Sequence, residues 1–105
     1  MSTYSFKIMT PDKTLYSENV TSVTVSGAGG RLTVLAHHTP MVALLAKGPI
    51  LIRTPSETLE GEMSAGLLEV RENEAVALVH AFRQIGDNYD EDEALRQARA
   101  DELMI

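Results

Sequence analysis

The segment YSFKIMTPDKTLYSENVTSVTVSGAGG, residues 4–30, carries the pattern that decides the fold. At its start the apolar residues Tyr4, Phe6 and Ile8 alternate with polar ones, and residues 22–26 repeat this alternation with two valines. A period of two is typical of a β-strand that buries one face and exposes the other. A Thr-Pro-Asp turn follows the first strand and a glycine cluster follows the second, so the segment predicts short strands joined by turns.

The rest of the first 80 residues repeats this rhythm of apolar runs and turn residues. Further strands are expected at residues 32–35, 41–46, 50–52, 59–64, 67–70 and 75–79. The run at 41–46 is apolar throughout and is expected to be buried on both sides, whereas the polar run at 59–64 is expected at a sheet edge. Turn signals roughly every eight to twelve residues favour a sandwich or barrel, and no helical pattern separates the strands as a parallel βαβ arrangement requires.

The last quarter of the chain has a different pattern. Asp90 can cap a helix, and Glu93 three residues later completes a capping box. The apolar residues that follow form a narrow stripe at helical spacing: Ala94, Leu95, Ala98 and Leu103. We therefore expect a β domain over residues 1–84 and a truncated C-terminal helical segment over residues 85–105.

Composition and charge exclude several classes of protein. A chain of 105 residues makes one domain, and it contains no cysteine for a disulfide, a thiolate metal site or a cysteine nucleophile. Nine basic residues against 15 acidic ones give a net charge of −6, and no basic stripe is present, so nucleic-acid binding is not expected. The longest apolar stretch, residues 41–46, is too short to cross a bilayer, so direct membrane insertion is not expected. With no signal peptide at its start, the chain is expected in the cytosol or on the cytosolic side of a membrane.

Several residues have side chains or spacings found in catalytic, cofactor or metal sites, but none of them matches the full pattern that such a site requires. A strand rather than a helix follows the glycines at 27–30, so they are interpreted as a wide turn and not as a phosphate loop. Ser64 lacks the glycine two positions earlier that a nucleophile elbow requires. His37 and His38 are adjacent, and neighbours on an extended chain point to opposite faces, which disfavours a shared metal ion. We therefore expect a non-catalytic module with no catalytic residue, no metal and no cofactor.

Four segments, taken in order, resemble one family, the epsilon subunit of bacterial rotary ATP synthases. They are FKIMTPDKTLYSENVTSVTVSGAGG at residues 6–30, LTVLAHHTPMVALLAKGPILI at 32–52, SAGLLEV at 64–70 and AVALVHA at 75–81. The first is similar to the family's strand, Pro turn and valine-rich strand ending in glycines. The second is similar to its His-containing loop and buried strand, the third to its Ser-Gly-Gly pattern, and the fourth to the strand after the next hairpin. The ordered set is specific to this family.

This resemblance implies a mainly β fold, a flattened antiparallel β-sandwich of about ten strands over residues 1–84 followed by one short C-terminal α-helix. It also implies a non-catalytic subunit of the central stalk, the rotor, which binds the gamma subunit and rests on the c ring. Such a subunit helps couple ion translocation to ATP synthesis or hydrolysis. Its implied location is the cytoplasmic face of the cell inner membrane, as a peripheral protein.

Matching positions indicate which residues would make these contacts. They are Gly29, Gly30 and Arg31 for the c ring, and Thr10, His38 and Ala43 for the gamma subunit. Arg31 stands where the family usually has an acid, so a contact with a basic loop of the c ring would change sign. Ala36 and His37 replace a proline and a glycine before the family histidine, and Ala65 replaces the first glycine of the Ser-Gly-Gly pattern.

The end of the sequence also departs from the family pattern. Typical bacterial members continue for two helices that can inhibit ATP hydrolysis, whereas this sequence ends at Ile105, within the first. Reduced or absent C-terminal inhibition is therefore expected. The nearest match to the family's ATP-binding motif, residues 89–94, has Glu93 in place of an arginine, so ATP binding is not expected.

Two other functions remain open from the residues alone. A free-standing β-sandwich that binds a small ligand would use the apolar run at 41–46 and the pair His37 and His38. An enzyme would rest only on Ser64 and the histidines. Saturable binding of a small ligand by a chain that never associates with stalk subunits would favour the first alternative.

Overall fold

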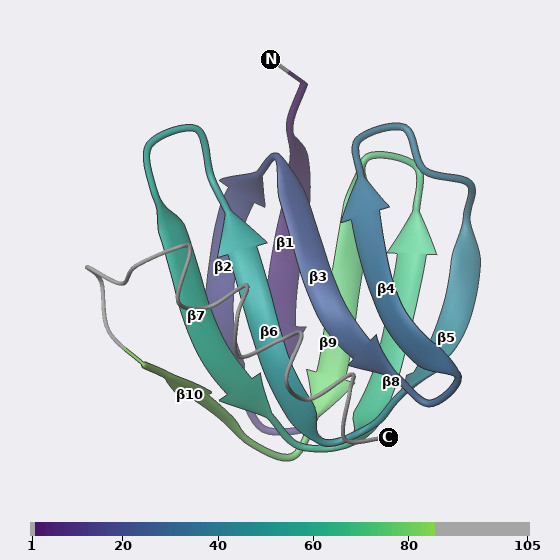
Figure 1. Ribbon diagram of the computed structural model, residues 1–105, viewed down its shortest axis with the longest axis vertical. Coiled ribbons are helices and arrows are strands. Elements are labelled where there is room, and N and C mark those ends of the chain that lie inside the picture. The colour runs from purple at the N-terminus through teal and green to yellow at the C-terminus, as the bar shows by residue number, and fades with distance from the viewer. Residues whose placement is uncertain (1, 86–105) are drawn as a thin grey trace.

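The computed structural model describes residues 2–85, which fold into ten β-strands (Figure 1). Their bounds are β1 Tyr4–Met9, β2 Thr14–Val20, β3 Ser22–Gly27, β4 Gly30–Leu35, β5 Met41–Leu45, β6 Gly48–Arg53, β7 Thr58–Met63, β8 Gly66–Arg71, β9 Glu74–Val79 and β10 Phe82–Gln84. Every strand expected from the alternation and the apolar runs is present. β2 and β10 are additional strands that those patterns did not single out.

The strands form two layers that pack face to face (Figure 1). One layer, here the β3 layer, runs in the order β10-β7-β6-β3-β4, and the other, the β1 layer, runs β5-β8-β9-β1-β2. A single bridge between Gly27 on β3 and Leu45 on β5 joins them. Neighbouring strands pair antiparallel except β1 and β9, which are parallel. The prediction of a mainly β, antiparallel sandwich of about ten strands is confirmed.

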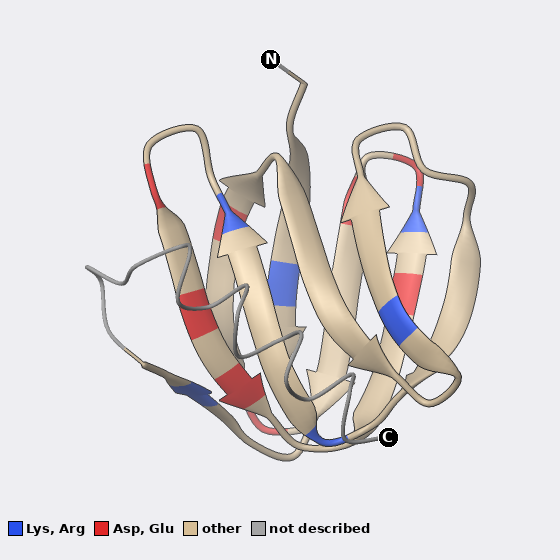
Figure 2. Ribbon diagram, in the orientation of Figure 1, with Lys and Arg blue, Asp and Glu red and all other residues tan. Residues whose placement is uncertain are grey.

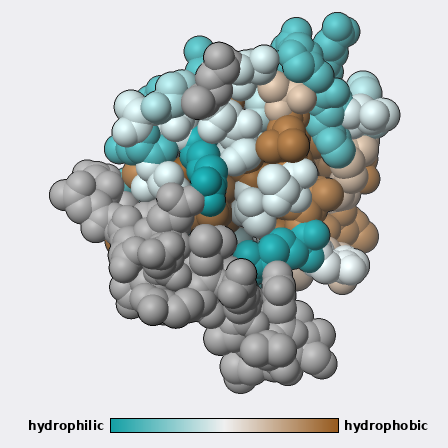
Figure 3. Space-filling view, turned by 45° about the horizontal axis from the view of Figure 1, so that its top comes forward, coloured by the Kyte–Doolittle hydropathy of each residue, from teal (hydrophilic) through white to brown (hydrophobic). Residues whose placement is uncertain are grey.

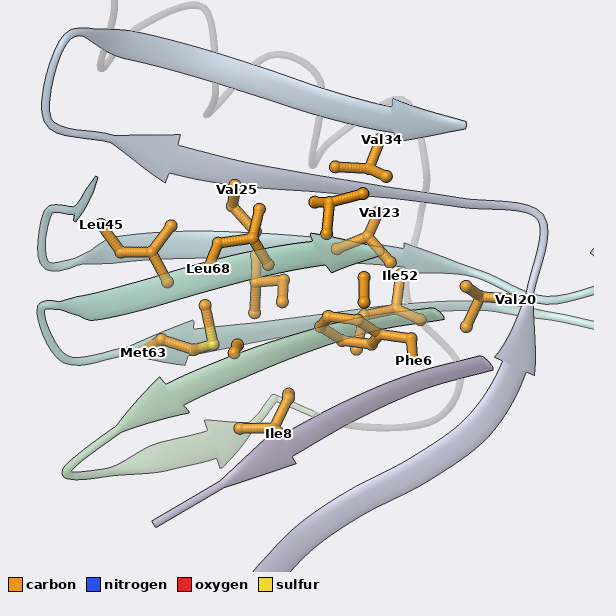
Figure 4. Packing of buried hydrophobic residues seen from close by; sticks show 14 of the residues in the cluster. Phe6, Ile8, Val20, Val23, Val25, Val34, Leu45, Ile52, Met63 and Leu68 are labelled. Atoms are coloured by element: carbon orange, nitrogen blue, oxygen red, sulfur yellow. The ribbon is translucent and has the colours of Figure 1, made fainter. Parts of the chain in front are cut away.

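The hydrophobic core lies between the two layers, where inward side chains of both meet (Figure 4). On β1, burial alternates as the sequence predicts, with Tyr4, Phe6 and Ile8 buried and their neighbours only partly so. The parallel strand β9 places Ala75 beside Phe6 and Ala77 beside Ile8. Large side chains thus lie next to small ones in the interior, an arrangement that allows close packing.

Successive strands run in opposite directions, so their turns collect at two ends of the sandwich (Figure 1). The lower end in Figure 1 holds the β1–β2, β3–β4, β5–β6, β7–β8 and β9–β10 turns, and we name it the β3–β4 end. The upper end holds the remaining connections, and we name it the β4–β5 end. Candidate residues at the same end can contact one partner together, whereas residues at opposite ends can share a partner only if it extends along the sandwich.

Two hairpin turns depend on residues that tolerate a positive φ. The β3–β4 turn pairs Gly27 with Gly30 across two residues, so it is tighter than the wide turn expected, and Gly30 has a φ of 132°. The β8–β9 turn pairs Arg71 with Glu74, and Asn73 between them has a φ of 61°. Glycine lacks a Cβ and asparagine adopts the left-handed region more readily than most residues, so each turn has a residue suited to it.

Two predictions about strand burial are wrong. β5 is not buried on both sides, because Val42 and Leu44 are 63% and 66% exposed while Leu45 is buried. The strand ends the β1 layer and is tied to the other layer by one bridge, so its second face points outward. β7 is not an edge strand, because it lies between β6 and β10 and directs Leu59 and Met63 into the core.

One side-chain hydrogen bond crosses the interior between the layers. The Tyr4 hydroxyl on β1 donates to the carbonyl oxygen of Val34 on β4 at 2.6 Å, and the bond is buried. Burial raises the pKa of Tyr4 well above the usual range of tyrosine. The Tyr16 hydroxyl is also buried but has no hydrogen-bond partner among the described residues. Burial, with repulsion from Glu18 and Glu57, raises the pKa of Tyr16 to about 12.

Tyr4→Phe is expected to lower the free energy of unfolding by about 1–3 kcal/mol, because it removes the buried bond and leaves the Val34 carbonyl without this donor. Tyr16→Phe is the matched control and is expected to be neutral or slightly stabilising, because the hydroxyl it removes has no partner in the described part of the chain. Urea unfolding followed by circular dichroism measures both. Equal losses in the two variants would contradict this assignment.

Several predictions fall outside the part of the chain that the structure describes. The helix expected over residues 85–105 lies there except for Ile85, as does the motif match at 89–94. The domain boundary after residue 84 therefore stays a prediction. Within residues 2–85 the structure contains no helix with the length and apolar character needed to cross a membrane.

Candidate functional site

The β3–β4 turn presents Gly29, Gly30 and Arg31, the residues predicted for a c-ring contact, at the β3–β4 end. All three are exposed, and a methyl group added at either glycine would lie within 4 Å of no other atom. The N–H of Ala28 donates to the carbonyl oxygen of Leu44 at 2.9 Å, which fastens the turn to β5. The turn therefore projects bare backbone at its two glycines from a fixed base, and the exposed Arg31 follows them at the start of β4.

Thr10, predicted for a gamma contact, organises the β1–β2 turn at the same end. Its Oγ1 accepts from the N–H groups of Asp12 and Lys13 at 3.3 and 3.2 Å, and its own N–H donates to the Lys13 carbonyl at 2.9 Å. Such local bonds are typical of threonine in turns. Beside this turn Thr10, Leu15 and His80 border a hollow that also reaches the β9–β10 turn.

His38, also predicted for a gamma contact, lies in the loop at the β4–β5 end. Its N–H donates to the Leu35 carbonyl at 3.3 Å, and its Nε2 lies 3.2 Å from the Met41 sulfur. The preceding residue, His37, is exposed and has a φ of 64°, so the two histidines are not on an extended chain as the sequence analysis assumed. Because Thr10 and His38 occupy opposite ends, a partner that touches both must run along the sandwich.

Ala43, the third residue predicted for a gamma contact, lies in the middle of β5 and packs against the core. The exposed side chains of this strand are Val42 and Leu44, which the sequence analysis did not single out. A hollow between the β3–β4 turn and β5 brings the three residues predicted for the c ring close to Ala43, but not to Thr10 or His38. Its lining includes Gly29, Gly30, Arg31, Leu32, Met41 and Ala43.

The outer face of the β1 layer carries a row of apolar side chains that the sequence analysis missed. Leu44 on β5, Leu67 on β8 and Leu78 on β9 are register neighbours, and Met9 on β1 follows Leu78. Leu44 and Leu78 are 66% and 41% exposed. We call these four residues the apolar row. Outward positions of an antiparallel sheet are normally polar, so the row has the character of a contact surface. The only signal in the sequence is that the runs containing Leu44 and Leu78 are apolar at every position.

Ser64, considered above as a nucleophile, holds two turns together at the β3–β4 end. Its Oγ accepts from the N–H groups of His80 and Ala81 at 2.9 and 3.2 Å and donates to the Ala65 carbonyl at 3.1 Å. The hydroxyl therefore links the β7–β8 turn to the β9–β10 turn. Across residues 2–85 there is no group of three or more His, Asp or Glu residues that could hold a metal ion.

Charged residues of both signs are interspersed over the strands (Figure 2). Two exposed ion pairs connect Arg83 with Glu62 at 2.8 Å and Arg71 with Glu69 at 2.5 Å. Exposed pairs of this kind contribute little to stability, about 0–1 kcal/mol. The described surface therefore presents a mixed field rather than a basic stripe, and its contact features are the β3–β4 turn, β5 and the apolar row.

Comparison with known proteins identifies the family from which this sandwich comes. Residues 3–84 match the model of the ATP synthase delta/epsilon chain beta-sandwich domain. The chain belongs to this family. An ATP synthase epsilon chain from Protochlamydia amoebophila is 35% identical over 83 residues, which cover 78% of this chain and 56% of the relative. The chain thus spans little more than half the length of that epsilon chain.

Two solved ATP synthase structures contain chains with the same fold. One, a Euglena gracilis mitochondrial ATP synthase comprising OSCP, F1 and the c-ring, matches with a TM-score of 0.76 and 21% identity, over 95% of this chain and 66% of the other. The second, the central stalk and c-ring of the Tetrahymena thermophila mitochondrial ATP synthase, matches with a TM-score of 0.67 and 16% identity, over 95% and 90%. At such low sequence identities, the two matches show a shared fold and nothing more specific.

Proposed function

We propose that this chain is a non-catalytic subunit of the central stalk, or rotor, of a rotary ATP synthase. In this role it binds the gamma subunit and the c ring and helps couple ion translocation to ATP synthesis or hydrolysis. The observation that carries the proposal is the family match over residues 3–84, which extends over all ten strands. The proposed location is peripheral, at the cytoplasmic face of the cell inner membrane.

A rotor subunit has to transmit torque without deforming, and two features of the described sandwich favour stiffness. Its strands are joined by hydrogen-bonded ladders within each layer, and the buried side chains of the core within residues 2–85 all belong to hydrophobic residues. The bond between Tyr4 and Val34 braces β1 of one layer against β4 of the other. Close-packed interiors of this kind have low compressibility.

In the proposed assembly the β3–β4 end faces the c ring. Gly29 and Gly30 leave the backbone open to close approach, because no side chain fills the space around them. Arg31 adds a positive charge at the start of β4. The bond between Ala28 and Leu44 ties this turn to β5, so a force applied at the turn reaches the β1 layer directly.

The gamma subunit is proposed to cover the outer face of the β1 layer. A partner that contacts Thr10 at one end and His38 at the other would run along this layer, over the apolar row. Ala43 faces inward, so the contact on β5 would be made by its neighbours Val42 and Leu44. Burial of such apolar side chains stabilises association by about 25 cal/mol per Å² of apolar area.

Co-purification tests this proposal directly. A tagged chain expressed together with the gamma subunit and the c ring is expected to recover both, and failure to recover either would contradict the proposal. Saturable binding of a small ligand by a chain that stays apart from these subunits would favour the alternative, a free-standing ligand-binding sandwich. The apolar run that motivated this alternative exposes Val42 and Leu44 on the surface, so the structure does not favour it.

Arg31→Glu is expected to change the affinity of the chain for the isolated c ring at least 5-fold, or about 1 kcal/mol, because it reverses the charge at the proposed contact. The free energy of unfolding of the isolated chain is expected to change by less than about 0.5 kcal/mol, since Arg31 is exposed. Arg71→Glu makes the same reversal at the β4–β5 end and is the matched control. Binding titrations and thermal unfolding measure these effects, and equal affinities of the two variants would refute the assignment.

A further inference from the structure

The outward side chains of the β1 layer form rows that cross its strands. Next to the apolar row, two residues along each strand, the register aligns Val42 on β5, Glu69 on β8, Val76 on β9 and Lys7 on β1. We call these four residues the mixed row. Hydrophobic surface is visible on the side of the molecule where β5 lies, at the right of Figure 3. The face therefore combines one apolar row with one row that holds a charge of each sign.

The two charges of the mixed row do not pair with each other. Val76 lies between them in the register, and Glu69 is bonded instead by Arg71, whose Nε lies 2.5 Å from its Oε1. Lys7 makes no ion pair with another residue of the described chain, 2–85. A carboxylate has a second oxygen that can accept from a further donor. Lys7 and Glu69 can therefore each bind a group from outside the chain.

The order of the strands makes this pair of charges complementary to itself. β9 lies between β8, which carries Glu69, and β1, which carries Lys7. A second copy turned by 180° about an axis along β9 places its β1 over β8 of the first copy and its β8 over β1. Lys7 of each copy then faces Glu69 of the other. Such reciprocal contacts are what a two-fold interface requires.

The same rotation stacks the two apolar rows on each other. Leu78, which is 41% exposed, meets its own counterpart on the axis, and Met9 of each copy lies over Leu67 of the other. An axis between β8 and β9 would also stack the apolar rows, but it would place Glu69 over Val76 and leave the carboxylate without a cation. Charge complementarity therefore selects the axis along β9.

The size and the margin of this face set the strength of the contact. Its five strands cover roughly 20 by 17 Å, because strands lie about 4.8 Å apart and rise about 3.4 Å per residue. This area is below the roughly 800 Å² per partner of a standard interface. At one margin Glu74 approaches its own counterpart, although its cross-strand neighbour Arg71 places a cation beside it in each copy. A weak dimer that forms with rising concentration is expected.

We propose that the free chain associates with a second copy of itself through the outer face of the β1 layer, with Lys7 of each copy paired to Glu69 of the other. The gamma subunit is proposed to cover the same face, so the dimer and the gamma complex exclude each other. The dimer covers the apolar row until a chain is assembled. Only this exclusion rests on the proposed function, and the self-association is independent of it.

Sedimentation velocity of the full chain, from about 1 μM to about 1 mM, measures the association. Lys7→Glu sets two carboxylates against each other at both symmetric positions and is expected to raise the Kd of the dimer about 10-fold. Combining it with Glu69→Lys exchanges the two charges and is expected to return the Kd to within about 3-fold of wild type. Lys47→Glu is the matched control, since this exposed lysine lies in the β5–β6 turn, outside the two rows.

The outcomes separate this inference from the proposed function. A wild-type chain that stays monomeric at every concentration would overturn the inference, whether or not the chain binds gamma. Equal Kd values for Lys7→Glu and Lys47→Glu, or no recovery on charge exchange, would overturn it as well.

Addition of the gamma subunit to the wild-type dimer tests the exclusion. Gamma is expected to convert the dimer into a complex with a single copy of this chain. A complex that holds gamma and two copies would contradict the exclusion. A dimer that does not bind gamma at all would count against the rotor function and leave the self-association standing. The concentration series and this titration need only the wild-type chain, so they decide the matter even if a variant does not fold.

Discussion

Replacing Phe6 by alanine is expected to lower the free energy of unfolding by about 3–5 kcal/mol. Phe6 is fully buried between the two layers (Figure 4). Its ring centroid lies 6.1 Å from that of Tyr16. Its register neighbour on β9 is Ala75, which is too small to fill the space that the ring would leave. The loss therefore combines the transfer free energy of the ring with the cost of a cavity, and it is a large part of the 5–15 kcal/mol typical of whole domains.

Urea unfolding of the wild-type chain and two variants measures this effect. Val42→Ala shortens another strand side chain, but one that is 63% exposed, and is expected to change the free energy of unfolding by less than about 0.5 kcal/mol. A loss below about 1 kcal/mol for Phe6→Ala would mean that the layers close over the missing ring, against the packing described.

The buried Phe6 and the exposed Val42 lie on strands whose sequence patterns differ in what they predict about the fold. On β1 and β3 polar and apolar residues alternate. Because successive side chains of a strand point to opposite faces, this alternation indicates which face is buried. The run at 41–46 is apolar at every position, so it contains no information about which face lies outward. Which face of β5 is exposed depends on its position at the end of the β1 layer. That position results from pairing with strands that are distant in the sequence, so the run itself does not reveal it.

Some features of the candidate site could likewise be predicted from the sequence, and others could not. The glycine cluster could be located as a turn from the sequence, because turns leave local signals, whereas Arg31 was assigned to the site through the family resemblance. The meeting of this turn with Ala43 across one hollow could not, since it depends on the bridge between Gly27 and Leu45. The apolar row was also out of reach, because it joins side chains from four strands whose register is set by the fold. The assignment of these residues to particular partners stays a prediction.

A methyl group at Gly66 is expected to be nearly as damaging as the loss of the Phe6 ring. Gly66 begins β8 and pairs with Leu45 on β5 and with Val79 on β9. A Cβ at this position would overlap the carbonyl oxygen of Leu78 and come within 2.9 Å of the Val79 Cγ1. Because the main obstacle is backbone of a paired strand, β8 would have to shift against β9. We expect Gly66→Ala to lower the free energy of unfolding by about 3 kcal/mol, at the upper end of typical overpacking costs.

Gly29→Ala is the matched control, because the same methyl group at this turn would have no atom within 4 Å. It is expected to remain within about 0.5 kcal/mol of the wild-type chain in the same urea titration. Equal stability of the two variants would mean that β8 and β9 lie further apart than the structure has them. The result also bears on the segment SAGLLEV, where Ala65 stands in place of a family glycine and Gly66 is kept. Ala65 is exposed in its turn, so its methyl group is tolerated, whereas the close approach of β9 requires glycine one residue later.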